Sequence, residues 1–218
     1  MIIVTSLAPS HKNENAQKEA VKSWVKTGFK IISVNHISEI EQLDYPDVEF
    51  VEPVKTGMAY LGKHYVPVSE LINVVKEYGR GLIINSDIII NSLPSLGEEA
   101  LIFNRYDFDK DIRINTMFRS GFDAFYLTEK HCNLPESKLC LGKCHWDYWL
   151  PLTLLQTGTR VHRPVEAHMF HKQHGLQYDM HSWEQTARIF AEETGIKGTV
   201  QQVSHKAFQV ITSRIENI

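Results

Sequence analysis

The sequence predicts an α/β fold in which helices flank a doubly wound, mixed but mostly parallel sheet. Two observations carry this prediction. As far as Ile90, the chain alternates between short apolar runs, which suit strands, and amphipathic stretches, which suit helices. The run 82–90 sets three polar residues among branched apolar ones and follows Gly79 and Gly81, which is typical of a central strand covered on both faces.

The first half of the chain is predicted to form β-α-β-α-β, followed by a further helix and strand. In chain order we expect a strand at 2–4, a helix at 16–25, a strand at 29–35, a short helix at 37–43, a strand at 48–51, a helix at 67–78 and the strand at 82–90. Glycine or proline punctuates most of these boundaries, with Gly28 ending the first helix and Pro53 the third strand.

The second half is less regular. We expect strands at 100–103, 121–127 and 159–165, a charged loop at 105–119 near the ligand, and C-terminal helices at about 181–216. Those helices pack either on the sheet or on a second subunit, as in a homodimer. The sequence contains no internal repeat or linker, so residues 1–218 are predicted to form a single domain.

Composition excludes several classes of protein. With 43% hydrophobic residues among 218, the chain can bury a sizeable core. The net charge is -3 without a long charged block, so we expect neither nucleic acid nor an anionic membrane as a partner. The start lacks the pattern of a signal peptide and no apolar run is long enough for a membrane span, so we expect a cytoplasmic protein.

The cysteine count supports a reducing compartment. Cys132, Cys140 and Cys144 are odd in number, which argues against a disulfide framework. Cys140, Cys144 and His145 could be considered as zinc ligands, but their spacing is unusual and no fourth ligand is evident. Free, partly buried thiols are the simpler interpretation.

Two acidic groups follow or lie within apolar strands. Asn85, Ser86 and Asp87 come at the carboxyl end of a predicted strand, where α/β sheets bind ligands, and Asp87 could hold a divalent metal. The alternative is a solvated turn. Asp123 lies alone in an apolar stretch, so it either pairs with an arginine or faces a ligand.

Asp147 is flanked by Trp146, Tyr148 and Trp149. An acid beside aromatic rings suits a sugar site, because pyranose faces stack on rings while carboxylates accept hydroxyl protons. The alternative is an acid at a helix N-terminus next to tryptophans of the core.

Histidines recur every three residues at His168, His171 and His174. Imidazole binds manganese or zinc, so one of these rings could join Asp87 on a metal, while the others support the site or lie on the surface. The sequence has no P-loop, because Gly57-x4-Gly62-Lys63 lacks the following Ser or Thr. Phosphate binding would therefore fall to a metal and to a base such as Lys63.

In this order, the groups resemble the nucleotide-diphospho-sugar transferases, which are glycosyltransferases with the Rossmann-like GT-A fold. The motifs that carry the resemblance are Thr5-Ser6, Ser33-Val34-Asn35, Asn85-Ser86-Asp87-Ile88, Gly121-Phe122-Asp123-Ala124-Phe125, the stretch 142–149 with its Trp-Asp-x-Trp, and the late His-x-x-His. They span about the first four-fifths of the chain.

The resemblance implies a role for each position. Asp87 stands where the metal-binding Asp-x-Asp of the family ends, with His171 or His174 as a further ligand of Mn²⁺ or Mg²⁺. Thr5, Ser6 and Asn35 resemble the nucleoside pocket, joined at the donor site by Asn85, Ser86 and Lys63. Asp123 and Asp147 resemble the catalytic carboxylates that contact the donor sugar or the acceptor, and Asp147 is the expected base if the enzyme inverts the anomeric configuration. Asn85 departs from the pattern because it replaces the first acid.

The resemblance thus implies transfer of a sugar from a nucleotide-sugar donor to a carbohydrate or other hydroxyl acceptor. Two alternatives remain. A nucleotidyltransferase that makes a sugar nucleotide uses a similar sheet, but the stretch after the first strand lacks the usual glycines. A non-catalytic, transferase-like domain that binds sugar or protein is the other, because Asn85 adds no charge to the metal site.

Overall fold

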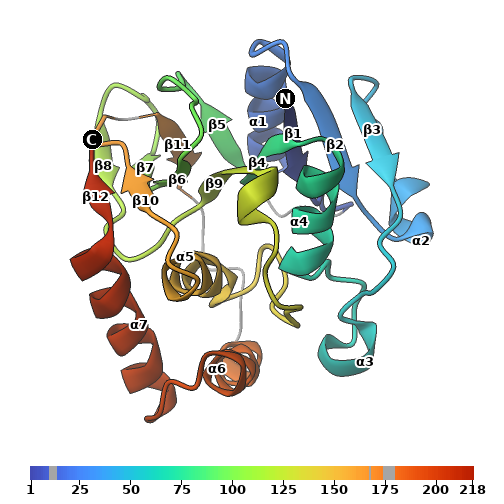
Figure 1. Cartoon of the computed structure of the whole chain (residues 1–218). Coiled ribbons are helices and arrows are strands. Elements are labelled where there is room, and N and C mark those ends of the chain that lie inside the picture. Colours follow the sequence, from blue (N-terminus) through green and yellow to red (C-terminus); the bar gives the residue numbers. More distant parts are fainter. Residues whose placement is uncertain (10–13, 167, 174–179) are drawn as a thin grey trace.

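The computed structural model describes residues 1–9, 14–166, 168–173 and 180–218. Its centre is an eight-stranded sheet with strand order β12-β10-β6-β9-β4-β1-β2-β3 (Figure 1). The strands are β1 (Ile2–Thr5), β2 (Lys30–Val34), β3 (Val48–Val51), β4 (Arg80–Ile84), β6 (Ala100–Phe103), β9 (Ala124–Thr128), β10 (Val161–Arg163) and β12 (Glu216–Asn217). All neighbouring pairs are parallel except the two made by β9. The predicted mixed, mostly parallel α/β fold is confirmed.

Each face of the sheet has its own apolar core, because side chains alternate along a strand. On one face, Ile3 and Leu82 pack with Trp24 of α1 (Glu14–Val25). On the other, Ile2 and Ile83 pack with α4 (Val68–Glu77). Helices therefore cover both faces, as a doubly wound sheet requires.

The antiparallel strand β9 decides which side chains meet at the carboxyl edge of the sheet. Its first residue, Ala124, is opposite both Ile84 at the end of β4 and Phe103 at the end of β6. Asp123 precedes β9, so it lies beside the residues that follow β4 and β6. Three segments that are distant in sequence thus contribute to one edge.

A second sheet of four strands lies next to this edge, and two sequence predictions are corrected by it. Its strands are β5 (Ile88–Ile90), β7 (Arg105–Phe108), β8 (Asn115–Met117) and β11 (Met169–Lys172), in the order β5-β11-β7-β8. The run 82–90 is therefore two strands in different sheets, and the predicted charged loop at 105–119 contains a hairpin. The indole of Trp24 donates to the Ile88 carbonyl at 2.8 Å, which holds β5 against α1.

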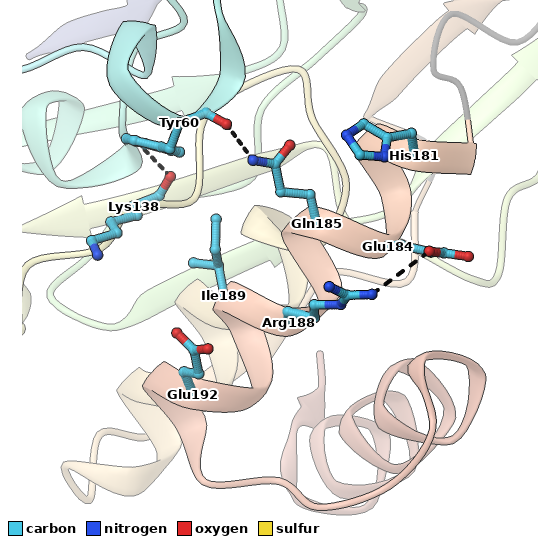
Figure 2. Close-up of a pocket in the computed structure, with 8 residues that line it drawn as sticks. All are labelled: Tyr60, Lys138, His181, Glu184, Gln185, Arg188, Ile189 and Glu192. Carbon is cyan, nitrogen blue, oxygen red and sulfur yellow. Dashed lines mark hydrogen bonds and ion pairs between the residues drawn. The ribbon is translucent and has the colours of Figure 1, made fainter.

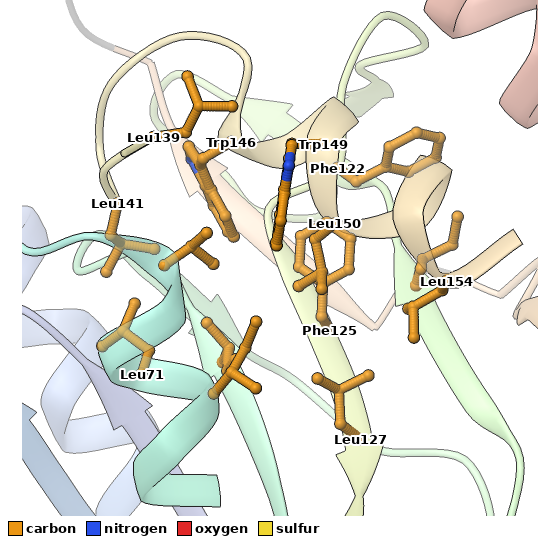
Figure 3. Packing of buried hydrophobic residues seen from close by; sticks show 14 of the residues in the cluster. Leu71, Phe122, Phe125, Leu127, Leu139, Leu141, Trp146, Trp149, Leu150 and Leu154 are labelled. Carbon is orange, nitrogen blue, oxygen red and sulfur yellow. The ribbon is translucent and has the colours of Figure 1, made fainter. Parts of the chain in front are cut away.

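Three helices cover the core on the α4 side: α5 (Trp146–Gln156), α6 (Met180–Thr194) and α7 (Val200–Arg214). Phe190 of α6 and Ile211 of α7 belong to the same buried cluster as Ile83, and Figure 3 shows Trp146 and Trp149 of α5 within it. Of the two expected placements for the C-terminal helices, packing over the sheet is the one observed; the homodimer stays a prediction.

The shorter helices are α2 (Ile37–Ile40), α3 (Met58–Leu61) and a 3₁₀ turn at Glu129–His131. Within the described ranges, none of the helices combines the length and the apolar character that crossing a bilayer demands.

Candidate active site

Polar and charged side chains from the end of β4 and the starts of β9 and β7 meet at the carboxyl edge of the sheet. Asn85, which follows β4, donates from Nδ2 to Oδ1 of Asp123 at 2.7 Å, and its backbone N–H bonds the Asp123 carbonyl. Nη1 of Arg105, at the start of β7, lies 3.2 and 3.3 Å from the two oxygens of Asp123. Of the two readings of Asp123, the arginine pair is the one observed. Asp123 is only 5% exposed, so these bonds hold its carboxyl group inside the site.

Arg105 also connects this pair to the second sheet. Its Nε donates to Oδ1 of Asp107 at 2.8 Å, and its guanidinium lies 4.2 Å from the centre of the Phe118 ring. Burial would lower the pKa of Arg105, but the charges of Asp123 and Asp107 outweigh it and raise that pKa. The guanidinium therefore stays charged and bridges two carboxylates.

His171 lies between two more carboxylates. Its Nδ1 is 2.9 Å from Oδ1 of Asp107 and its Nε2 is 3.5 Å from Oδ2 of Asp87. Burial lowers the pKa of His171, but hydrogen bonds to Asp107 and Asp87 raise it to about 9. For Asp107, burial raises the pKa, yet His171 and Arg105 bring it below the ordinary value. In this structure the imidazolium neutralises part of the acidic cluster.

Asp87 and His171 suit two ligands of one divalent ion. With metal–ligand distances of about 2.1 Å, two ligands lie about 3.0 Å apart at a right angle and about 3.4 Å apart at a tetrahedral angle. The observed separation of 3.5 Å is close to this range. The described part of the chain contains no group of three such side chains, so phosphate oxygens and water would complete the coordination. His174, the other predicted ligand, lies outside the described residues.

A second observation at this edge indicates a ligand. Oδ1 of Asn85 is buried and has no hydrogen-bond partner among the described residues. An orphaned buried acceptor costs free energy, so such atoms are normally satisfied by a ligand, an ion or water. This oxygen belongs to a residue close to Asp87 in the chain, and it can accept a hydrogen bond from a hydroxyl or coordinate a cation.

Asp147 is partly buried in the first turn of α5. Desolvation and the nearby charge of Asp123 raise its pKa to about 7, while backbone N–H groups of Phe122 and Asp147 and the charge of Arg105 act in the opposite direction. Gly121 gives the carboxylate room, because a Cβ there would lie 3.0 Å from Oδ2 of Asp147. An acid with this pKa can exchange a proton near neutral pH.

The tryptophans beside Asp147 are not a sugar platform. Trp146 and Trp149 are 2% and 1% exposed, and Trp146 packs edge-on against Phe125. The expected stacking on these rings is therefore wrong, and the core interpretation is the correct one. Buried indoles fix the start of α5, which places Asp147.

His145 joins α5 to the other two helices of its layer. It adopts a left-handed backbone with φ 75° before α5. Its Nδ1 lies 3.1 Å from the Thr186 hydroxyl and its Nε2 lies 2.8 Å from the Ser204 hydroxyl. Burial lowers the pKa of His145 to about 4, so a neutral imidazole ties α5 to α6 and α7.

The zinc alternative finds no support in this geometry. Both ring nitrogens of His145 already face hydroxyls. Cys132, Cys140 and Cys144 are free thiols, and burial raises the pKa of each. Inert buried thiols are the observed state.

The residues expected in a nucleoside pocket lie at the ends of β1 and β2. Thr5 is buried and its hydroxyl donates to the Ile84 carbonyl at 2.8 Å. Asn35 is also buried and donates to the Leu7 carbonyl at 2.8 Å and to Glu39 at 3.0 Å. Ser6 is partly exposed beside Asn35. These bonds shape the edge between the strands, and contact with a nucleoside stays a prediction.

Ser86 and Lys63 are less closely tied to the cluster. Ser86 is partly exposed between Asn85 and Asp87. Lys63 is exposed just after Gly62, which ends α3 with φ 69°. A role for Lys63 in phosphate binding stays a prediction.

Arg105 and Asp107 are site residues that sequence reasoning missed, because both fell in the segment predicted as a loop. The signal was the alternation Arg105-Tyr106-Asp107-Phe108 directly after an apolar strand. Two charges at alternate positions share one face of a strand.

A separate cleft of about 310 Å³ lies along α6, opposite Tyr60 and Lys138 (Figure 2). The amide of Gln185 donates to the Tyr60 carbonyl across it. The cleft is lined by residues of α6 between 181 and 192 together with Tyr60 and Lys138, and none of these residues belongs to the charged cluster at the carboxyl edge.

Comparison with known proteins leaves the family open. No family model and no curated protein matches the chain. Among solved structures, it is similar to a protein from Bacillus anthracis named as a glucose-1-phosphate thymidylyltransferase, in complex with sucrose, with a TM-score of 0.41 and 11% identity over 95% of this chain and 98% of that one. That name corresponds to the nucleotidyltransferase alternative rather than to sugar transfer. A likeness this weak does not decide between the two functions.

Proposed function

We propose that this chain is a metal-assisted glycosyltransferase, which moves a sugar from a nucleotide-sugar donor to a hydroxyl acceptor. The observation that supports it best is a pair of metal-type ligands, Asp87 and His171, 3.5 Å apart, in the same charged cluster as Asp147 with its pKa of about 7. The pair suits a diphosphate leaving group. The acid suits an acceptor hydroxyl.

Donor binding falls to the carboxyl edge of β4. A bound Mn²⁺ or Mg²⁺ would supply positive charge against the departing nucleoside diphosphate. Asp87 and His171 are the residues that would hold it. The orphaned Oδ1 of Asn85 would accept a hydrogen bond from a hydroxyl of the donor, and Arg105 would keep Asp123 fixed beside it.

Acceptor activation falls to Asp147. In the ionised form its carboxylate takes the proton of the acceptor hydroxyl as the acceptor oxygen bonds to the anomeric carbon. The bond from that carbon to the diphosphate oxygen breaks, and the electron pair leaves with the diphosphate. An acceptor oxygen that attacks from the face opposite the leaving group inverts the anomeric configuration.

A nucleotidyltransferase is the second candidate, since the same metal-type ligands, Asp87 and His171, could serve a triphosphate. The loop after β1 argues against it, because Leu7-Ala8-Pro9 contains no glycine to bring backbone N–H groups close to a triphosphate. The third reading is a non-catalytic sugar- or protein-binding domain.

One experiment separates the three. The purified chain is incubated with a panel of UDP-, GDP-, dTDP- and CMP-sugars, with and without Mn²⁺, and nucleotide release is measured. We expect metal-dependent release from one donor, lost in Asp87→Ala and kept in the control Asp111→Ala, whose carboxylate pairs with Arg113 instead. Pyrophosphate release from a nucleoside triphosphate plus a sugar phosphate would identify the nucleotidyltransferase. Inactivity in both assays would leave the non-catalytic reading.

A further inference from the structure

We propose that Asn104 is a positioning residue for Asp147, and that it acts through the peptide group between Gly121 and Phe122. The side-chain amide of Asn104 holds the carbonyl of this peptide group, and the carboxylate of Asp147 faces its N–H. The effect on catalysis rests on the proposed function, in which Asp147 is the base. The orientation of the peptide group does not depend on that function.

Asn104 follows β6 at the carboxyl edge of the sheet, where its side chain closes a loop. The residue is only 7% exposed. Its Nδ2 donates to the Gly121 carbonyl at 2.7 Å and to the Phe118 carbonyl at 3.3 Å. One amide group therefore holds both ends of the loop 118–121, which leads toward β9.

The surroundings of Asn104 permit one orientation of its amide. The two loop carbonyls can only accept hydrogen bonds, whereas Nη1 of Arg163, 3.4 Å from Oδ1 of Asn104, can only donate. The guanidinium is itself held, because its Nε donates to Asn217 at 2.9 Å. A flipped amide would place two donors against the guanidinium and an oxygen against two carbonyls. Nδ2 of Asn104 must therefore face the loop.

The peptide group between Gly121 and Phe122 carries this contact to Asp147. The bond is trans, so its C=O and N–H point in opposite directions in one plane, and a fixed carbonyl also fixes the N–H. The N–H of Phe122 donates to the carboxylate of Asp147. Gly121 permits the close approach, because a Cβ there would lie 3.0 Å from Oδ2 of Asp147. The amide, the peptide group and the carboxylate thus form one hydrogen-bonded chain.

The same loop is tied to the helix that carries Asp147. The hydroxyl of Tyr148, the next residue in α5, donates to the Ser120 carbonyl. The loop is therefore held by α5 on one side and by Asn104 on the other. Loss of the Asn104 amide would leave the peptide group beside Asp147 free to rotate.

Amide hydrogen exchange of the full chain, followed by NMR, tests the orientation without any substrate. We expect the Phe122 amide to exchange slowly in the wild type and about 10-fold faster in Asn104→Ala, because the loop carbonyls lose their donor. Asn104→Leu, which fills the volume of the side chain, should have the same effect. Fast exchange of Phe122 in the wild type, or equally slow exchange in the wild type and these variants, would overturn the inference.

Asn115→Ala is the matched control for the exchange measurement. The amide of Asn115 also donates to a loop carbonyl, that of Ile112, but in the turn between β7 and β8. We expect Phe122 to exchange in this variant as in the wild type. Faster exchange of Phe122 in Asn115→Ala, equal to that in Asn104→Ala, would contradict a specific role of Asn104.

The pH–rate profile of sugar transfer separates positioning from a merely structural role. The N–H of Phe122 lowers the pKa of Asp147, so a weaker bond should raise that pKa. The acidic limb of the profile should therefore move to higher pH in Asn104→Ala. Asp123 and Arg105, whose charges also act on Asp147, are unchanged in this variant. Structural damage alone would lower the rate by one factor at every pH, and an unmoved limb would overturn the inference.

Failure of the proposed function gives a different result. Slow exchange at Phe122 that depends on Asn104, in a wild type that transfers no sugar, would support the orientation of the peptide group and contradict the proposed function. Sugar transfer by the wild type, with exchange at Phe122 that is independent of Asn104, would do the reverse.

Discussion

Replacing Asp147 with Asn is expected to stabilise the fold at neutral pH while it abolishes transfer. The carboxyl has a pKa of about 7 in the folded chain against an ordinary value of 3.8. Between these values the folded state holds a proton that the unfolded state has lost, so stability falls as pH rises through that interval. At about 1.36 kcal/mol for each pH unit, the whole interval corresponds to about 4 kcal/mol.

About 3 kcal/mol of this loss falls between pH 5 and pH 8, since the interval from pH 5 to about 7 covers roughly two pH units. The amide introduced by Asp147→Asn cannot ionise, so the advantage of this variant over wild type should grow by about that amount over the same range. Urea unfolding of both proteins at the two pH values measures it.

Asp111→Asn is the matched control, because its hydrogen bonds with Arg113 lower the pKa of Asp111. The carboxylate of Asp111 therefore stabilises the fold above its ordinary pKa. The difference in stability between Asp111→Asn and the wild type should not shift in favour of the variant between pH 5 and pH 8. An advantage of Asp147→Asn that is constant or shrinks between pH 5 and pH 8 would refute the reasoning.

Three further predictions concern the same region. Gly121→Ala would place a Cβ 3.0 Å from Oδ2 of Asp147 and from Phe118, so kcat should fall at least ~10-fold with little change in Tm, and an unchanged kcat would contradict the tight fit. Asp123→Asn removes a charge that raises the pKa of Asp147, so the acidic limb of the pH–rate profile should move to lower pH; a move to higher pH would count against it. Trp146→Ala should lower the free energy of unfolding by about 3–5 kcal/mol in urea unfolding, because the indole is in the core. Unchanged stability with weaker donor binding would instead support stacking of a sugar on this ring.

The sequence was sufficient for the buried strands of the main sheet, whereas the exposed edge strand β12 lies where the last predicted helix was expected to end. Runs such as Ile2-Ile3-Val4 and Leu82-Ile83-Ile84 are apolar on both faces, and the helices between them have clear apolar stripes. The polar residues just after such strands, Asn85 and Asp87 among them, were found by the same rule. Their place at a carboxyl edge follows from parallel pairing.

The second sheet was missed for a physical reason. Its strands are three or four residues long, and β7 and β8 carry charged or polar side chains that are only partly buried. Short strands of this kind are stabilised by their partners rather than by their own apolar runs. The partner of Asp107 is His171, and no local pattern reveals a pairing over so long a distance in the chain.

The aromatic cluster shows a different limit. Trp146 and Trp149 flank an acid in the sequence, which is compatible with a sugar platform or with a core. Only the packing of α5 on Phe125 and on α7 decides between them. Asp147 is therefore held by buried tryptophans, and its raised pKa is a consequence of the same burial.

The most direct test of the proposed function is calorimetric titration of the wild-type chain with nucleoside diphosphates, with and without Mn²⁺. A donor site at Asp87 and His171 predicts that one nucleoside diphosphate binds tightly and that its affinity falls when Mn²⁺ is removed. Binding of none of the nucleotides in either condition would contradict the transferase and leave the sheet as a scaffold.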